Sequence, residues 1–200
     1  MLKSSFTDDL TEAGCDEAGR GCLAGPVYAA AVIFPAGYTN PYLNDSKKLT
    51  ANQREDMRIV IEKDALAWAV ETVDNNIIDR INILNASIEA MHGAIEKLTV
   101  KPELILVDGN RFHPYPGIPH RCIIKGDAAF MSIAAASILA KTYRDDLMRF
   151  LDSFFPQYGW KSNKGYPTEE HRKAIEQWGI SDLHRKSFKL GRQLKLFNSF

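Results

Sequence analysis

Residues 27–34 read VYAAAVIF, a continuous apolar run bounded by Gly25-Pro26 and Pro35. Small and β-branched side chains without a polar interruption are typical of a buried strand. Three further runs of the same kind lie at residues 65–73, 104–107 and 122–124. We therefore expect a β-sheet that contains residues 27–34 as a buried strand.

Helical patterns lie between and after these runs. Thr50-Ala51-Asn52-Gln53 forms a capping box, which predicts a helix to about Lys63. Residues 83–98 carry apolar side chains at helical spacing. A longer helix is expected after Asp127, where apolar positions recur at three and four residues, and its small side chains would let it pack closely on a sheet. These positions are Met131, Ala134, Ala135, Ile138 and Leu139.

The order of the elements favours an α/β fold with a mixed central sheet flanked by helices. Beyond Phe155 the pattern is broken by prolines and glycines, and a short helix then begins after Thr168, a plausible N-cap, and stops at Gly179. We expect a main domain over residues 1–155 and a small, basic helical appendage over residues 156–200.

The charges are balanced over the whole chain but not along it. The 25 basic residues match the 25 acidic ones, so net charge gives no general attraction for nucleic acid or for an anionic membrane. Residues 161–200 carry nine basic and four acidic side chains. This segment is either a phosphate-binding surface or a solvated basic tail, and charge alone does not decide between them.

The cysteines and the hydrophobic runs bear on the compartment. Cys15, Cys22 and Cys122 are odd in number and form no C-x-x-C pair, which argues against a disulfide framework or a structural zinc site. No signal-peptide core is found, and no run approaches the roughly 20 apolar residues of a membrane span. We expect a soluble, cytoplasmic monomer with no membrane partner.

The densest group of chemically active residues is Asp16-Glu17-Ala18-Gly19-Arg20-Gly21, placed where the first strand should end. Two acids beside two glycines suit metal ligands next to a backbone loop that a substrate approaches closely. An exposed acidic turn is the structural alternative.

Two more acids occupy comparable positions. Asp108 follows the apolar run 104–107, at the sheet edge where α/β proteins usually place ligands, although it could equally be a turn residue. Asp127 precedes the long helix and could be an ordinary N-cap. Together with Asp16 and Glu17, these carboxylates would select Mg²⁺ or Mn²⁺ over zinc. Two such ions about 4 Å apart are the usual device for phosphodiester hydrolysis.

Other kinds of site fit less well. In a dinucleotide fingerprint that begins at Gly19, the third glycine would come one residue before Gly25, and Pro26 and a strand follow where a helix should. A P-loop would need Lys-Ser or Lys-Thr after the glycines. A serine or cysteine hydrolase would need a nucleophile elbow, which is missing. The histidines are scattered and are expected to be surface or core residues; they are His92, His113, His120, His171 and His184.

Seven ordered blocks resemble the ribonuclease HII family between about Glu12 and Phe188. They are Asp16-Glu17-Ala18-Gly19-Arg20-Gly21, Asp45-Ser46-Lys47, Val107-Asp108-Gly109, Lys125-Gly126-Asp127, Ala135-Ala136-Ser137-Ile138-Leu139-Ala140-Lys141, Lys164-Gly165-Tyr166 and His184-Arg185-Lys186-Ser187-Phe188. The resemblance implies a ribonuclease H-like fold and a site in which four carboxylates hold two divalent ions. These carboxylates are Asp16, Glu17, Asp108 and Asp127.

The resemblance also implies roles in substrate binding. Gly19, Arg20 and Gly21 are similar to the family's loop whose backbone reads the ribose 2′-hydroxyl. Tyr166 is similar to the tyrosine that packs on the neighbouring sugar. Candidates for phosphate contacts are Lys47, Lys141, Arg185 and, more weakly, Ser187. The chain departs from the family at Ala128 and Ala129, where a small or polar residue and then lysine often stand, and at Asn163, where histidine is frequent.

The implied activity is endonucleolytic. It would hydrolyse the RNA strand of RNA/DNA hybrids and the bond on the 5′ side of a single ribonucleotide in duplex DNA, leaving 3′-hydroxyl and 5′-phosphate ends. One alternative is a hybrid-binding protein without turnover, against which the four acids argue. Another is a different two-metal nuclease, which would lack the ribose-reading residues.

The end of the chain carries a further resemblance. Gln193-Leu194-Lys195-Leu196-Phe197 is similar to the peptide with which bacterial repair proteins bind the sliding clamp, with Gln193, Leu194, Leu196 and Phe197 as anchors. The alternative is that these residues pack on the enzyme's own body.

Overall fold

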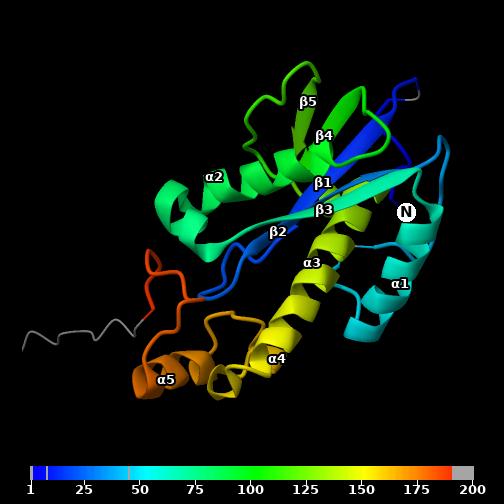
Figure 1. Cartoon of the computed structure of the whole chain (residues 1–200). Helices are drawn as coiled ribbons and strands as arrows, with labels where there is room; N and C mark the ends of the chain where they lie inside the picture. Colours follow the sequence, from blue (N-terminus) through cyan, green and yellow to red (C-terminus); the bar gives the residue numbers. More distant parts are fainter. Residues whose placement is uncertain (1, 8, 45, 191–200) are drawn as a thin grey trace, which may run out of the picture.

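The computed structural model describes residues 2–7, 9–44 and 46–190. Its centre is a five-stranded sheet in the order β3-β2-β1-β4-β5 (Figure 1). β1 pairs antiparallel with β2 and parallel with β4, and β5 continues the parallel half. The strands are β1 (Glu12–Ala18), β2 (Val27–Ile33), β3 (Ala67–Val73), β4 (Leu104–Asp108) and β5 (His120–Ile123). The mixed sheet expected from the sequence is therefore confirmed.

Helices cover both faces of the sheet (Figure 1). One apolar core joins α2 to one face of the sheet, and a second joins α1 and α3 to the other. The helices are α1 (Ala51–Asp64), α2 (Asn75–Glu96), α3 (Met131–Asp152), α4 (Trp160–Asn163) and α5 (Glu169–Trp178), with short 3₁₀ turns η1 (Gly126–Ala128) and η2 (Pro156–Tyr158). Within the described part of the chain, no helix is both long and apolar enough to span a bilayer.

The long helix α3 lies unusually close to β1, as its small side chains predicted. Ala134, Ala135 and Ile138 are fully buried against the sheet. At Gly14 a Cβ atom would lie 2.3 Å from the carbonyl carbon of Ser132, so only glycine fits there. This close approach fixes α3 against the strand that carries two of the acids.

The helix α2 begins earlier than the pattern over residues 83–98 predicted. It is two helices joined at Asn82, whose φ of 67° interrupts the helix. The Asn82 side chain accepts hydrogen bonds from the amides of Leu84 and Asn85, so it caps the second part. The periodicity identified the second part and missed the first, which Asp74 caps.

Other boundaries follow local chemistry. The capping box at Thr50 and Gln53 is present, Thr168 caps α5, and Gly179 ends that helix with φ 74°. β5 spans residues 120–123 instead of 122–124, because its parallel pairing runs from Ile105 with His120 to Asp108 with Ile123.

Segment 156–190 packs against the main sheet domain through its own apolar cluster. Tyr158, Trp160 and Ile175 of this segment contact Leu23 and Met148, which belong to the loop after β1 and to α3. A domain boundary at residue 155 stays a prediction. The clamp-like residues Gln193, Leu194, Leu196 and Phe197, and Asp45 of the Asp45-Ser46-Lys47 block, lie outside the described residues.

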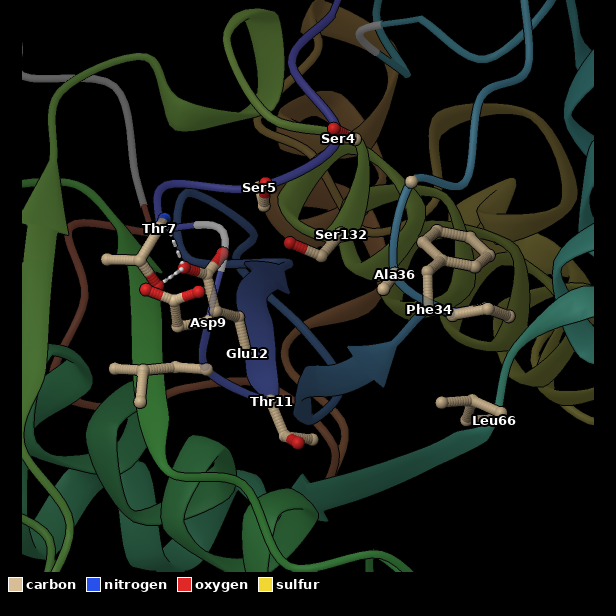
Figure 2. Close-up of a pocket in the computed structure, with 13 residues that line it drawn as sticks. Ser4, Ser5, Thr7, Asp9, Thr11, Glu12, Phe34, Ala36, Leu66 and Ser132 are labelled. Carbon is tan, nitrogen blue, oxygen red and sulfur yellow. Dashed lines mark hydrogen bonds between the residues drawn. The ribbon is translucent and has the colours of Figure 1, made fainter.

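A cavity of about 350 Å³ lies where the chain enters β1 (Figure 2). The Glu12 carboxylate in its wall accepts hydrogen bonds from the amides of Phe6 and Thr7 and from the Thr7 hydroxyl. These bonds already occupy Glu12, which anchors the N-terminal segment. Asp16 and Glu17, two of the acids predicted for catalysis, lie toward the other end of β1.

Candidate active site

The sheet topology brings the four predicted acids to one edge. Asp16 and Glu17 are near the end of β1, and Asp108 is the last residue of β4. β1 and β4 are parallel, and Cys15 is opposite Val107, so Asp16 and Asp108 come next on neighbouring strands. Asp127 lies in η1, soon after β5. Carboxyl ends of parallel strands share one edge of a sheet, which is the usual place for a ligand site.

Three of the four acids line two adjoining cavities, and Asp127 lines neither of them. One cavity has a volume of about 260 Å³ and is lined by Asp16, Glu17 and Asp108. The rest of its wall is formed by the loop residues 18–21 and by Ser46, Lys47, Arg54, Ser137, Lys141 and Tyr166. The second, of about 320 Å³, shares Glu17, Arg20 and Asp108 and continues toward α2. Consecutive residues of a strand face opposite sides, so Asp16 bonds to Ser137 of α3 and Glu17 reaches the α2 side.

The carboxylates repel one another. Burial raises the pKa of Asp16 well above its usual value, and the charges of Glu17 and Asp108 raise it further. Burial also raises the pKa of Glu17, although Arg20 opposes this, and burial and Asp127 raise the pKa of Asp108. Clustered acids with raised pKa values are typical of functional sites, because a bound cation relieves the repulsion.

Two of the acids face cationic side chains instead of a common centre. Lys47 Nζ lies 3.0 Å from Asp127 Oδ2, and Arg20 Nη1 lies 3.0 Å from Glu17 Oε1. Asp108 accepts a hydrogen bond of 2.7 Å from the Gly126 amide. Within residues 2–7, 9–44 and 46–190, no three His, Cys, Asp or Glu side chains are arranged to hold one ion together. The donor set nevertheless fits hard divalent cations, since every candidate ligand is a carboxylate oxygen.

The structure excludes the simplest structural explanation for Asp127. The N-cap of α3 is Phe130, which makes no side-chain capping bond, and Asp127 sits in the preceding 3₁₀ turn. Its side chain is almost completely buried and is bonded to Lys47. A buried carboxylate that caps no helix suits a ligand better than a turn residue. Among the departures from the family pattern, Ala128 is exposed next to it.

Buried Arg144 supports the glycine loop from below. Its guanidinium donates to the carbonyls of Ala24, Pro26 and Lys164. Gly19 has φ 98°, and a Cβ atom there would lie 2.1 Å from Arg144 Nε, whereas Gly21 has open space around it. The bonds to Ala24 and Pro26 hold the segment that follows the glycine loop against this arginine. Sequence reasoning missed Arg144, because nothing in its helical context marks it as buried.

Arg185 is also buried beneath the loop. It is fully buried and donates to the carbonyls of Gly25 and Arg20, while its Nη2 has no hydrogen-bond partner among the described residues. Ser187 donates from its amide and its hydroxyl to Asp79 of α2. Neither side chain lines the cavity of the acids, so this geometry gives no support to the phosphate contacts expected of them.

Tyr166 and Lys141 do line that cavity. Tyr166 is partly exposed, and Lys141 Nζ lies 5.9 Å from the centre of its ring. Lys141 is held by Asp145 at 2.5 and 2.6 Å. Asn163 is the residue that departs from the family pattern before Lys164-Gly165-Tyr166. Its side chain accepts a hydrogen bond from the Gly165 amide and donates one to the Tyr158 carbonyl, so it shapes the turn that presents Tyr166.

Comparisons with known proteins place this chain among its relatives. A family model described as Ribonuclease HII matches residues 13–191. The Ribonuclease HII of Porphyromonas gingivalis is 58% identical over 189 residues, which cover 94% of each chain. Ribonuclease H2 from Pyrococcus horikoshii has a similar structure, with a TM-score of 0.76 and 26% identity over 91% of this chain and 95% of that one. A structure described as the PCNA:RNase HII complex from Archaeoglobus fulgidus matches with a TM-score of 0.77 and 29% identity, covering 94% of this chain and 98% of that one.

Proposed function

Because the chain belongs to the ribonuclease HII family, we propose that Asp16, Glu17, Asp108 and Asp127 are the catalytic carboxylates of its active site. Membership makes the protein a ribonuclease H, an endonucleolytic hydrolase with a ribonuclease H-like fold. Its substrates in this proposal are RNA/DNA hybrids and duplex DNA with single embedded ribonucleotides. In the latter it cuts on the 5′ side of the ribonucleotide and leaves 3′-hydroxyl and 5′-phosphate ends.

One observation carries the proposal. A single cavity of about 260 Å³ is lined by three of the acids, by the loop Gly19 to Gly21 and by Tyr166. A nuclease that selects ribonucleotides needs a group that recognises the 2′-hydroxyl within reach of the acids that promote hydrolysis. Both kinds of group border this cavity, from separate parts of the chain.

The carboxylates would hold divalent cations, Mg²⁺ or Mn²⁺, since these ions prefer oxygen ligands. Two such ions would supply an activated water and would stabilise the leaving oxygen. Asp127 and Glu17 are now paired with Lys47 and Arg20, so these two basic side chains would be the ones to neutralise the charge of a bound phosphate beside the carboxylates.

The neighbouring residues orient the substrate. The backbone of the loop Gly19 to Gly21 recognises the 2′-hydroxyl, and the absence of a Cβ at Gly21 leaves room for the sugar. The Tyr166 ring packs on the neighbouring sugar and thereby places the bond on the 5′ side of the ribonucleotide among the carboxylates. Lys47 and Lys141 bind the phosphates that flank this bond.

The test is cleavage of a DNA duplex that carries one ribonucleotide in one strand, with an all-DNA duplex of the same sequence as control. We expect one cut, on the 5′ side of the ribonucleotide, only with Mg²⁺ or Mn²⁺, and ligatable 3′-hydroxyl ends. Cleavage in the presence of a chelator would contradict the metal-dependent mechanism. Cleavage of RNA/DNA hybrid with no cut at the single ribonucleotide would restrict the activity to hybrids.

The C-terminal peptide supports a second partner. The Archaeoglobus fulgidus protein is described in a complex with PCNA. We propose that Gln193, Leu194, Leu196 and Phe197 bind a sliding clamp in the same manner as short peptides that order on binding, with affinity concentrated in the apolar anchors. Calorimetric titration of the clamp from the same organism should give binding with the full chain and none with a chain truncated after Arg192. Equal binding by both would contradict the proposal.

A further inference from the structure

Two histidines that the active site does not use are in contact in the interior of segment 156–190, with their rings tilted at 45° to each other. His171 of α5 and His184 are both fully buried, beside the buried ring of Trp160. Trp160 Nε1 lies 3.0 Å from His171 Nε2, and that same nitrogen lies 3.2 Å from His184 Nε2. The three rings therefore form one continuous polar chain inside an apolar cluster.

Obligate donors at both ends fix the tautomers of this chain. An indole N–H only donates, so His171 Nε2 must carry a lone pair, and its proton is on Nδ1. The Ser181 amide donates to His184 Nδ1 at 2.9 Å, so the proton of His184 is on Nε2 and points at His171. Both rings are therefore neutral, and burial lowers the pKa of each, for His184 to about 4.

The chain has one direction and ends at the sugar-binding tyrosine. With its proton on Nδ1, His171 donates to the Tyr166 carbonyl at 2.9 Å. At the other end, His184 pairs with Ala24 in an antiparallel bridge, and the Leu183 carbonyl accepts the Gly25 amide. The rings thus connect the backbone of Tyr166 to the segment that leads out of the glycine loop.

We propose that His171 is a positioning residue for Tyr166, and that His184 and Trp160 hold it in the tautomer which donates to the Tyr166 carbonyl. The inference rests on the proposed role of Tyr166 at the sugar. The side chain of Tyr166 extends into a cavity while its backbone is fixed from behind, so the place of the ring depends on how that backbone is held. The histidine pair would set the distance between the tyrosine and the loop that together bracket one sugar.

Two conservative variants separate this role from a merely structural one. In His171→Asn the side-chain amide keeps a donor near the position of Nδ1, and the acceptor for Trp160 and His184 is lost. In His171→Gln the side-chain oxygen keeps an acceptor near the position of Nε2, and the donor to Tyr166 is lost. The asparagine variant leaves two buried donors without a partner and should have the lower melting temperature. His113→Gln, at an exposed loop histidine, is the matched control.

We expect activity and stability to change in opposite orders. Below the melting temperature of both variants, His171→Gln should cleave the single-ribonucleotide duplex about tenfold more slowly than His171→Asn, through kcat, with little change in KM, since small misplacements of positioning groups slow catalysis strongly. His113→Gln should match the wild type. If cleavage follows stability, with the asparagine variant the slower one, the pair is structural only and the inference is wrong.

A readout without turnover keeps this test separate from the proposed function. Long-range ¹H–¹⁵N spectra of the imidazoles in the wild-type protein should show His171 protonated on Nδ1 and His184 on Nε2. The Tyr166 ring signals should shift more in His171→Gln than in His171→Asn. Opposite tautomers, or equal shifts, would overturn the inference even if the enzyme cleaves as proposed. If the tautomers and shifts are as expected and the wild type does not cut at a single ribonucleotide, only the proposed function fails.

Discussion

Among the residues that the structure describes, Tyr166 is the one aromatic side chain that borders the carboxylates and the glycine loop in the cavity of the acids. It is partly exposed, and its environment is polar on several sides: Lys141 lies over the ring, and Cys22 interacts with its hydroxyl. A tyrosine that served only the core would be buried, as Tyr158 is a few residues earlier. The exposure of Tyr166 is therefore consistent with a surface kept for a ligand.

If the Tyr166 ring contacts the sugar at the cut, as we propose, Tyr166→Ala should reduce cleavage at a single ribonucleotide about a hundredfold, while affinity for plain duplex DNA changes by less than about threefold. Tyr166→Phe keeps the ring and should retain most of the activity. Turnover and duplex affinity are measured on the same preparations. Parallel losses in cleavage and in DNA affinity would show that Tyr166 is a structural residue.

Gly19 and Gly21 of the loop differ in how much space they leave for a Cβ atom. Gly19→Ala places a Cβ on Arg144 at a positive φ, and we expect a loss of about 1–3 kcal/mol in the free energy of unfolding. Gly21→Ala meets open space and should change that free energy by less than about 0.5 kcal/mol. Urea unfolding of both variants measures this difference. Gly21→Ala should still cleave poorly, because in the proposed mode of binding its methyl group would occupy space that the sugar needs. A fully active Gly21→Ala would remove the loop from ribose recognition.

At the level of elements, strand ends were easier to predict from sequence than helix starts. The apolar runs located β2, β3 and β4 and only part of β5, because β2 and β4 are buried on both faces and leave an unbroken pattern, whereas β5 is largely exposed. The sequence did not indicate the helical part before Asn82, since a break in the middle of α2 depends on one side chain capping its own backbone. Asp127 looked like an N-cap because it precedes α3 by a few residues. In the structure it belongs to the 3₁₀ turn η1, and the N-cap of α3 is Phe130.

The histidine pair shows what local patterns cannot indicate. His171 and His184 are 13 residues apart and belong to no spacing typical of a metal or catalytic site. Only the packing of α5 against the following segment brings them together. The buried roles of Arg144 and Arg185 are equally invisible in sequence, because arginine usually indicates an exposed position and the burial depends on tertiary contacts with carbonyl groups.

The buried histidine pair also predicts how the stability of the protein depends on pH. The pKa of His184 is about 4 in the folded protein, because burial and the neighbouring His171 disfavour its charge, and it is near 6.5 in the unfolded chain. The contribution of His184 to the free energy of unfolding is therefore complete above about pH 6.5. As the pH falls toward 4, about 3 kcal/mol of this free energy is lost. The buried acids Asp16 and Glu17 act in the opposite direction, since their raised pKa values favour the fold at acid pH.

A comparison with one variant isolates the histidine. We expect the stability advantage of the wild type over His184→Gln, measured by urea unfolding, to shrink steadily from about pH 7 to about pH 4.5. The acids are common to both proteins and cancel in the difference. A constant difference over this range would mean that His184 titrates normally and that the ring chain is not neutral.

In the whole molecule, the sheet places several carboxylates close together at one edge. The fold itself does not need these charges. At neutral pH this repulsion opposes folding, so removal of one charge should not destabilise the protein in the absence of metal. Proteins often keep such destabilising groups at functional sites at the expense of stability. The four acids could be selected from sequence because Asp16, Glu17 and Asp108 stand at strand ends and Asp127 stands in the turn before α3. Their partners Lys47 and Arg20 were predicted only as substrate contacts.

The measurement that bears most directly on the active site is the turnover of Asp108→Asn in Mg²⁺, determined together with its affinity for the single-ribonucleotide duplex and its free energy of unfolding. Glu176→Gln, at an exposed carboxylate on α5, is the matched control. A neutral amide ligates divalent ions poorly, so we predict that turnover falls by at least about a hundredfold while duplex affinity and metal-free stability stay at or above the wild-type values. Turnover of Asp108→Asn equal to that of Glu176→Gln would contradict the account, because Asp108 would then lie outside the catalytic site.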